Sequence, residues 1–273
     1  MATQPNGEDH KPRGQGRRRA KPSLSPMEAH LVATVGEFVG TLLFLYFSYA
    51  GNVMAVSRAG MTAPTGGMSS ETVLFISLAY SFSLLVNVWA FYRISGGLFN
   101  PAVTLGLCLS SQLPWVRGLL FVPAQLLASL CAGGLVSAMF PVDVSEANSV
   151  LGGGASVVQG LFMEMLFTAL LVFVVLMLAS EKSKDTFLAP IGIGLALFVA
   201  MIAGTAYTGA SLNPARSLGC AVAARSFPGY HWIYWLGPVL GSLLSASFYT
   251  LVKYIHYEEA NPGQDADHPN EVV

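Results

Sequence analysis

Long apolar runs alternate with short polar segments along most of the chain. Each run is close to the roughly 20 residues that an α-helix needs to cross a bilayer. Only 11% of the residues are charged, whereas a soluble domain carries about 25%. The pattern predicts an all-α membrane protein with six transmembrane helices, at approximately Leu31–Ala50, Val73–Tyr92, Leu119–Phe140, Val157–Ala179, Phe187–Ala206 and Trp232–Ile255.

The two ends of the chain differ from this pattern. Residues 1–28 are basic and rich in Gly and Pro, and residues 256–273 are acidic and polar. Neither has apolar periodicity, so we predict disordered tails around a membrane domain at 29–255.

An even number of spans places both tails on one side, which the positive-inside rule identifies as cytoplasmic. The tail side would hold the N-terminal arginines, Arg93, Arg117, Lys182, Lys184 and Lys253, and the other side Arg58, Arg216 and Arg225. We expect a multi-pass protein of the plasma membrane, with an endomembrane as the alternative.

The chain repeats itself. The first span contains GEFVGT, with Glu37 four residues before Thr41, and the fourth contains MEMLFT, with Glu164 four residues before Thr168. Each half, about 29–140 and 156–255, has three spans. An odd number inverts the second half relative to the first, and a site in such a protein is expected near the midplane, where the repeats meet.

Two related polar segments interrupt the apolar pattern, SGGLFNPAVTLG from Ser95 and TGASLNPARSLG from Thr208. Asn is a strong helix N-cap and Pro is favoured at the first helical position. The segments that follow are only half long enough to cross a membrane. We therefore predict two re-entrant half-helices, Pro101–Leu109 after Asn100 and Pro214–Ala224 after Asn213, with Ala102 and Ala215 in their first turns.

In an inverted repeat the two half-helices enter from opposite sides, so their N-termini meet near the middle. Helix N-termini carry partial positive charge. Two Asn amides at that point can donate hydrogen bonds to one water oxygen, which turns the water's own hydrogens outward. This interrupts a proton wire, and the positive field repels cations and protons. The motifs predict a pore centre at Asn100-Pro101-Ala102 and Asn213-Pro214-Ala215.

The remaining polar residues suggest no catalysis. Glu37 and Glu164 lie within spans, where a charge costs roughly 2.5–3.5 kcal/mol. We expect each to accept hydrogen bonds from the re-entrant loop and fix its shape. The three cysteines and five histidines are scattered, so no metal site, cofactor, nucleic-acid partner or enzymatic function is expected.

The paired motifs, the paired glutamates and YTGASLNPARSLG resemble the aquaporin, or major intrinsic protein, family from about Glu28 to Lys253, and VNVWAFYRISGGLFNPAVTLG is similar to fungal members. The resemblance implies a helical bundle with a pore in every protomer of a homotetramer. It also implies an outer selectivity constriction at Tyr80, Met201, Ala210 and Arg216.

Two of these positions depart from the strict water-channel pattern, because Tyr80 stands where Phe is usual and Met201 where His is usual. Ser217 stands where the glycerol-conducting branch usually has Asp. The leading hypothesis is a passive water channel that excludes protons and ions. The alternatives are a channel for other small neutral solutes (hydrogen peroxide, ammonia or glycerol), a secondary transporter, or a structural or gated-shut membrane protein.

A regulatory site is predicted in RRRAKPSLSP, where Ser23 and Ser25 follow a basic run. Phosphorylation would add negative charge beside the arginines and move the tail relative to the pore mouth. The alternative is a flexible tail that contacts anionic lipid.

Overall fold

The computed structural model describes residues 24–59, 68–181 and 186–260. Six helices in these ranges are long and apolar enough to cross a membrane. They are α1 (Pro26–Ala59), α2 (Ser70–Phe91), α4 (Trp115–Met139), α5 (Val157–Val175), α6 (Ala189–Thr208) and α8 (Ile233–Tyr254). The chain is a multi-pass membrane protein, and the predicted all-α fold is confirmed.

Shorter elements connect the long helices. The half-helices α3 (Pro101–Leu109) and α7 (Pro214–Ala223) follow the two Asn residues, as predicted. A π-helical turn, η2 (Leu176–Ser180), continues α5. The other elements are η1 (Val144–Ala147), η3 (Thr186–Leu188) and α9 (Tyr257–Ala260).

The first helix is longer than its apolar run. It has 34 residues and is therefore about 51 Å long, whereas the hydrocarbon core is about 30 Å thick. Hydropathy marks only the part inside lipid. Helix α1 includes residues 26–28 of the expected N-tail, because Ser25 and Glu28 cap it: Glu28 N donates to Ser25 Oγ (3.3 Å) and Ser25 N to Glu28 Oε2 (2.7 Å).

The expected C-tail likewise begins with helix α9. Residues 1–23, Ser23 included, and residues 261–273 lie outside the described residues, as do Lys182 and Lys184 of the charge asymmetry.

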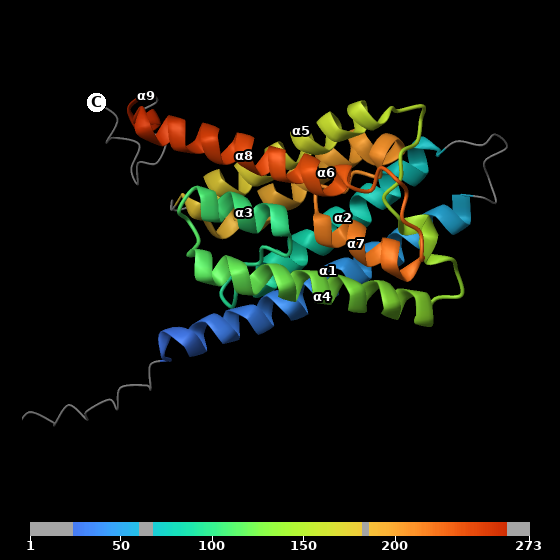
Figure 1. Ribbon diagram of the computed structural model, residues 1–273, viewed down its shortest axis with the longest axis horizontal. Helices are drawn as coiled ribbons and strands as arrows, with labels where there is room; N and C mark the ends of the chain where they lie inside the picture. Colours follow the sequence, from blue (N-terminus) through green and yellow to red (C-terminus); the bar gives the residue numbers. More distant parts are fainter. Residues whose placement is uncertain (1–23, 60–67, 182–185, 261–273) are drawn as a thin grey trace, which may run out of the picture.

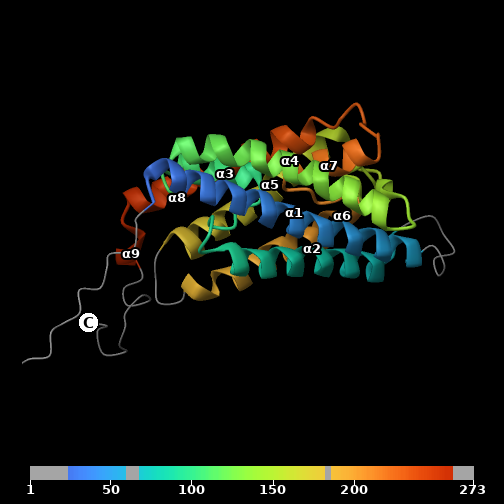
Figure 2. The same ribbon diagram turned by 90° about the horizontal axis from the view of Figure 1, so that it is seen from below.

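The two repeats, α1–α4 and α5–α8, interlock through their half-helices. Helix α1 begins and α8 ends at one end of the molecule, here called the tail end (Figures 1 and 2). Helix α3 runs from the middle toward the tail end and α7 toward the opposite, far end (Figure 1). Each half-helix packs on a long helix of the other repeat, α3 on α8 and α7 on α4, while α2 packs on α6 across the repeats. Both half-helices are thus fixed from both repeats.

Small residues allow these close approaches. A Cβ atom on Gly133 of α4 would lie 2.5 Å from the carbonyl oxygen of Gly219 on α7, and one on Gly219 would lie 2.4 Å from the carbonyl oxygen of Ser129. The backbones of α4 and α7 are therefore in contact, as is common where membrane helices pack through small residues.

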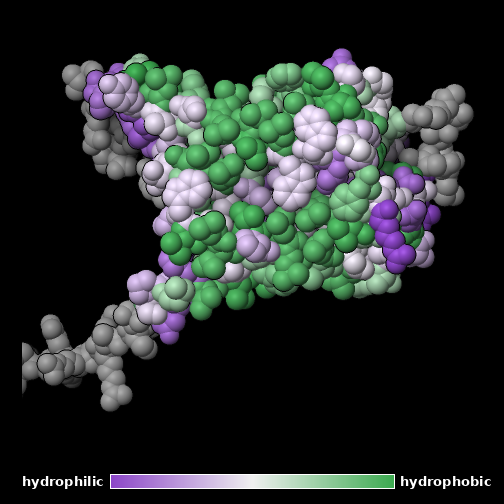
Figure 3. Space-filling view, in the orientation of Figure 1, coloured by the Kyte–Doolittle hydropathy of each residue, from purple (hydrophilic) through white to green (hydrophobic). Residues whose placement is uncertain are grey.

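The face drawn in Figure 3 is mostly apolar around the middle of the bundle and more polar toward its two ends. Exposed side chains include Val35, Phe47, Phe82, Leu119, Leu166 and Phe248. An apolar surface of this extent is unusual on a soluble monomer. It fits contact with the lipid bilayer, the partner expected for a chain with six transmembrane helices.

Candidate pore

The two Asn side chains cap their own half-helices and also tie the repeats together. Asn100 Oδ1 accepts from Ala102 N (2.8 Å), and Asn213 Oδ1 accepts from Ala215 N (2.9 Å) and Arg216 N (3.3 Å). Asn100 Nδ2 donates to Leu212 O (2.8 Å), and Asn213 Nδ2 donates to Phe99 O (2.9 Å). Since an amide group has two N–H bonds, each Asn keeps one N–H that these contacts do not use.

Both Glu side chains hold the loops that lead into the half-helices. Glu37 accepts from Ser95 Oγ (2.7 Å) and Leu98 N (2.9 Å) on Oε1, and from Phe99 N (2.8 Å) and Gln125 Nε2 (2.9 Å) on Oε2. In all four contacts the partner group donates a hydrogen bond to the carboxylate. The side chain is completely buried, so hydrogen bonds from protein groups compensate its desolvation.

Glu164 makes the equivalent contacts in the second repeat. Its Oε1 accepts from Thr208 Oγ1 (2.7 Å) and Ser211 N (2.9 Å), and its Oε2 accepts from Leu212 N (2.8 Å). The two loops therefore have the same hydrogen-bond pattern, as expected for copies of one structural unit.

The same loops contain a strained residue in each repeat. Phe99 has φ +52° and Leu212 has φ +54°, a left-handed conformation that is unfavourable for bulky side chains. The N–H of each donates to a buried carboxylate, and the carbonyl of each accepts from the Asn of the opposite repeat. These paired bonds hold the backbone in the conformation that brings the two half-helix N-termini together.

A cavity of about 270 Å³ runs along these loops. Its polar lining includes Asn100, Asn213 and Arg216 together with the loop backbones. An apolar part of the wall comes mainly from α2, α5 and α6, with Leu84, Val88, Leu171, Val175, Ile193 and Leu197. A passage with polar groups on one side and aliphatic groups on the other offers hydrogen bonds without binding a small solute tightly.

Arg216, which is 2% exposed, lines the cavity. Its Nη1 donates to Ser149 Oγ and its Nη2 to Gly209 O (3.2 Å). Its Cζ lies 5.0 Å from the centroid of the Tyr80 ring, within the range of a cation–π contact. Its Nε has no hydrogen-bond acceptor among the described residues.

The four expected constriction residues are placed differently by the structure. Tyr80 and Arg216 line the cavity and contact one another. Ala210 is buried, has φ +43° and follows Gly209, whose carbonyl binds the guanidinium. Met201 is fully buried on α6, and among the described residues the cavity lining includes neither Met201 nor Ala210.

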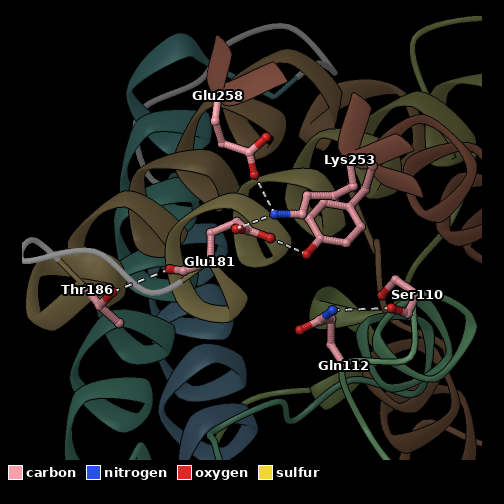
Figure 4. A network of polar contacts seen from close by, with 7 residues as sticks. Ser110, Gln112, Glu181, Thr186, Lys253 and Glu258 are labelled. Carbon is pink, nitrogen blue, oxygen red and sulfur yellow. Dashed lines mark hydrogen bonds and ion pairs between the residues drawn. The ribbon is translucent and has the colours of Figure 1, made fainter. Parts of the chain in front are cut away.

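A second polar cluster lies at the tail end of the molecule. Lys253 lies between Glu181 and Glu258 (Figure 4), with N–O distances of 3.1 and 2.6 Å. Glu181 also accepts from Tyr249 Oη. The bond from Lys253 lowers the pKa of Glu258. This cluster ties the end of η2 to α8, next to Ser180, which lines the cavity.

The same end has two further side-chain bonds. Gln112, another lining residue, donates to Ser110 O (3.3 Å; Figure 4), and Tyr92 Oη donates to Ala179 O (3.1 Å).

Several residues of the pore were not found from the sequence. Gln125 supports Glu37, and Tyr49 Oη donates to the carbonyl oxygen of Arg216 (2.7 Å). The position of Gln125 in an apolar span could have indicated a supporting role, because a polar side chain inside the membrane needs a buried hydrogen-bond partner. Ser149 had no signal, since it lies in a connecting segment 67 residues from Arg216.

Comparison with known proteins agrees with the arrangement described above. The family model described as Major intrinsic protein matches residues 25–249. The chain is 65% identical over 243 residues to a Gibberella zeae protein named Probable aquaporin-3, covering 89% of this chain and 85% of the relative. It is 53% identical over 247 residues to Aquaporin-7 of Botryotinia fuckeliana, covering 89% of this chain but only 54% of that protein.

A solved structure described as the aquaglyceroporin from Plasmodium falciparum has a similar fold. Its TM-score is 0.67 at 21% identity, covering 84% of this chain and 99% of that chain. At this identity the likeness concerns the fold.

Proposed function

Because this chain belongs to the major intrinsic protein family, whose members are passive channels for water or small solutes, we propose that its main permeant is water. In this proposal protons and ions are excluded at two places, the paired Asn-Pro-Ala half-helices and the constriction at Arg216. The chain acts as a channel and not as an enzyme.

One observation carries the proposal: Asn100 and Asn213 both line the cavity, and each has one amide N–H not used within the protein. Both amides are fixed by bonds to their own helix and to the opposite loop. A water molecule between them accepts two hydrogen bonds and directs its own hydrogens along the passage, away from the centre. The half-helix N-termini add roughly half a positive charge each, which opposes passage of a hydronium ion.

The constriction adds a second barrier. Arg216 lines the cavity, and its guanidinium places a fixed positive charge there. The Tyr80 ring lies against the Arg216 guanidinium, and in this proposal the two side chains form the constriction. Both features favour a small neutral molecule over a cation or a larger solute.

A second candidate is a channel that conducts hydrogen peroxide, ammonia or glycerol as well as water. It is favoured by the presence of Met201 at a position where water channels usually have His. Met201 is a flexible apolar side chain in the segment that the family resemblance assigns to the constriction. The described cavity lining does not include Met201, so this candidate requires its side chain to move into the passage, where it would add an apolar group and no polar one.

The family and the distribution of charge along the chain also suggest an assembly and a location. We propose a homotetramer in the plasma membrane with cytoplasmic termini, the tail end facing the cytoplasm. Ser23 and Ser25 remain the proposed regulatory site. Ser25 caps α1 with Glu28, so a phosphate there would lie at a helix N-terminus but beside a carboxylate.

Stopped-flow shrinkage of proteoliposomes in an osmotic gradient tests the proposal. Water flux well above that of protein-free vesicles, with a lower activation energy, is expected. Flux that saturates with solute or needs an ion gradient would instead indicate a transporter. Flux equal to that of protein-free vesicles would refute a constitutively open channel. Glycerol, hydrogen peroxide and ammonia uptake by the same vesicles, compared with Met201→His, distinguishes the two candidates.

A further inference from the structure

Three buried serine hydroxyls connect Arg216 to the pore centre. Arg216 Nη1 donates to Ser149 Oγ, Ser149 Oγ lies 2.6 Å from Ser217 Oγ, and Ser217 Oγ lies 2.5 Å from Ser211 Oγ. Ser211 Oγ then donates to the carbonyl oxygen of Asn213 (3.0 Å). The three serines are 0 to 3% exposed, so solvent does not compete for these hydrogen bonds.

The direction of every bond in this serine chain follows from the count of hydrogens. A hydroxyl group has one hydrogen. The hydrogen of Ser211 goes to a carbonyl oxygen, which cannot donate, so Ser217 must donate to Ser211. Ser217 has then used its hydrogen, so Ser149 must donate to Ser217. Ser149 is left as an acceptor, which is what the Arg216 guanidinium requires.

All the dipoles in the chain therefore point the same way, from the cation toward the Asn213 carbonyl. Aligned hydrogen bonds polarise one another, so each strengthens the next. A cation at the donor end and a carbonyl at the acceptor end both favour this direction. The arrangement gives Ser149 Oγ more acceptor strength than an isolated hydroxyl has.

The segment that carries Ser149 is itself fixed by contacts with neighbouring loops. Asn148 Nδ2 donates to Ser226 O (3.0 Å), Leu151 N to Tyr230 Oη (3.1 Å), and Gly152 N to Tyr207 O (2.9 Å). Ser149 is thus a fixed acceptor, and the guanidinium position depends on it.

We propose that Ser149 and Ser217 are positioning residues for selectivity, which hold the Arg216 guanidinium across the opening through this serine chain. The inference rests on the proposed function, and it identifies residues that set the selectivity of the proposed channel. Ser217 carries the sharper test, because it neither touches the guanidinium nor lines the cavity. Any change in selectivity on altering it must act through its neighbours in the chain.

The test compares Ser217→Ala and Ser149→Ala with the wild-type protein in proteoliposomes. We expect the ratio of urea to water permeability to rise about three- to tenfold, since one hydrogen bond that positions the guanidinium is lost. Ser217→Thr keeps the hydroxyl and should restore most of the wild-type ratio. Ser48→Ala is the matched control, because Ser48 is a fully buried serine whose hydroxyl binds Phe44 O within its own helix.

A second readout does not depend on conduction. A cryo-EM structure of full-length Ser217→Ala should show the guanidinium displaced from Ser149 relative to wild type, with the backbone of α7 unchanged. An unchanged guanidinium, or an unchanged permeability ratio in vesicles whose wild-type counterpart conducts water, overturns the inference. Wild-type vesicles without water permeability would count against the proposed function instead, and the structural comparison would still decide the role of the serine chain.

Discussion

The clearest energetic prediction concerns Glu164, the buried carboxylate that holds the second re-entrant loop. Replacing it with Gln keeps the shape but turns one acceptor oxygen into an NH₂ group. If the NH₂ group replaces Oε2, it faces the N–H of Leu212. If it replaces Oε1, it faces the N–H of Ser211 and the hydroxyl of Thr208. Either orientation leaves one buried backbone N–H without an acceptor.

The size of the effect follows from these contacts. An unsatisfied buried donor costs about 1–3 kcal/mol. Each bond that remains changes from a charged to a neutral acceptor and loses about 1 kcal/mol, since charge-assisted bonds are roughly twice as strong. Relief from burying a charge offsets part of this loss. We expect Glu164→Gln to lower the free energy of unfolding by about 2–4 kcal/mol and to reduce water permeability, because Leu212 is no longer held at positive φ.

Unfolding in mixed micelles by SDS titration measures the stability, and stopped-flow shrinkage of vesicles with equal amounts of protein measures permeability. Glu71→Gln is the control, because Glu71 is exposed at the start of α2 and should change stability by less than about 0.5 kcal/mol. A loss below that value for Glu164→Gln, with unchanged permeability, would refute the claim that this carboxylate holds the loop.

Three further predictions concern other parts of the molecule. Gly133→Ala places a methyl group 2.5 Å from a carbonyl oxygen of α7 and should cost about 1–3 kcal/mol, measured by the same SDS titration; an unchanged midpoint would contradict the close packing. Lys253→Met removes two partly exposed ion pairs and should change stability by less than about 1 kcal/mol; a larger loss would show that the tail-end cluster supports the fold. Burial lowers the pKa of His231, so the folded state binds protons less readily than the unfolded state, and stability should fall as the pH decreases below about 6.5. Thermal midpoints of wild type and His231→Gln at pH 7.5 and 5.5 test this, and equal pH dependence would contradict it.

The fold could be predicted from the sequence because apolar run length and helix-capping residues are local signals. The predicted half-helix Pro101–Leu109 begins directly after Asn100, and α3 has the same bounds. The ends of α1 could not be read in this way. Hydropathy responds to the lipid-embedded part, and the first turn depends on the pairing of Ser25 with Glu28.

The pore was only partly predictable, since its support comes from distant contacts. The equivalent positions of Glu37 and Glu164 indicated a shared role, and the structure shows that each carboxylate accepts hydrogen bonds from its re-entrant loop. The contact of Ser149 with Arg216 has no sequence pattern, because it depends on how a connecting segment folds over the far end. The unused amide N–H of each Asn was likewise visible only after its other bonds were known.

The measurement that tests the central claim most directly records water and proton flux in the same vesicles. Proteoliposomes containing the wild-type protein and an internal pH dye are given an osmotic gradient and, separately, a pH gradient. The account predicts water flux well above that of protein-free vesicles and proton flux equal to theirs. Proton flux that rises in proportion to the amount of protein would contradict the claim that the two Asn amides and half-helix N-termini interrupt the proton wire.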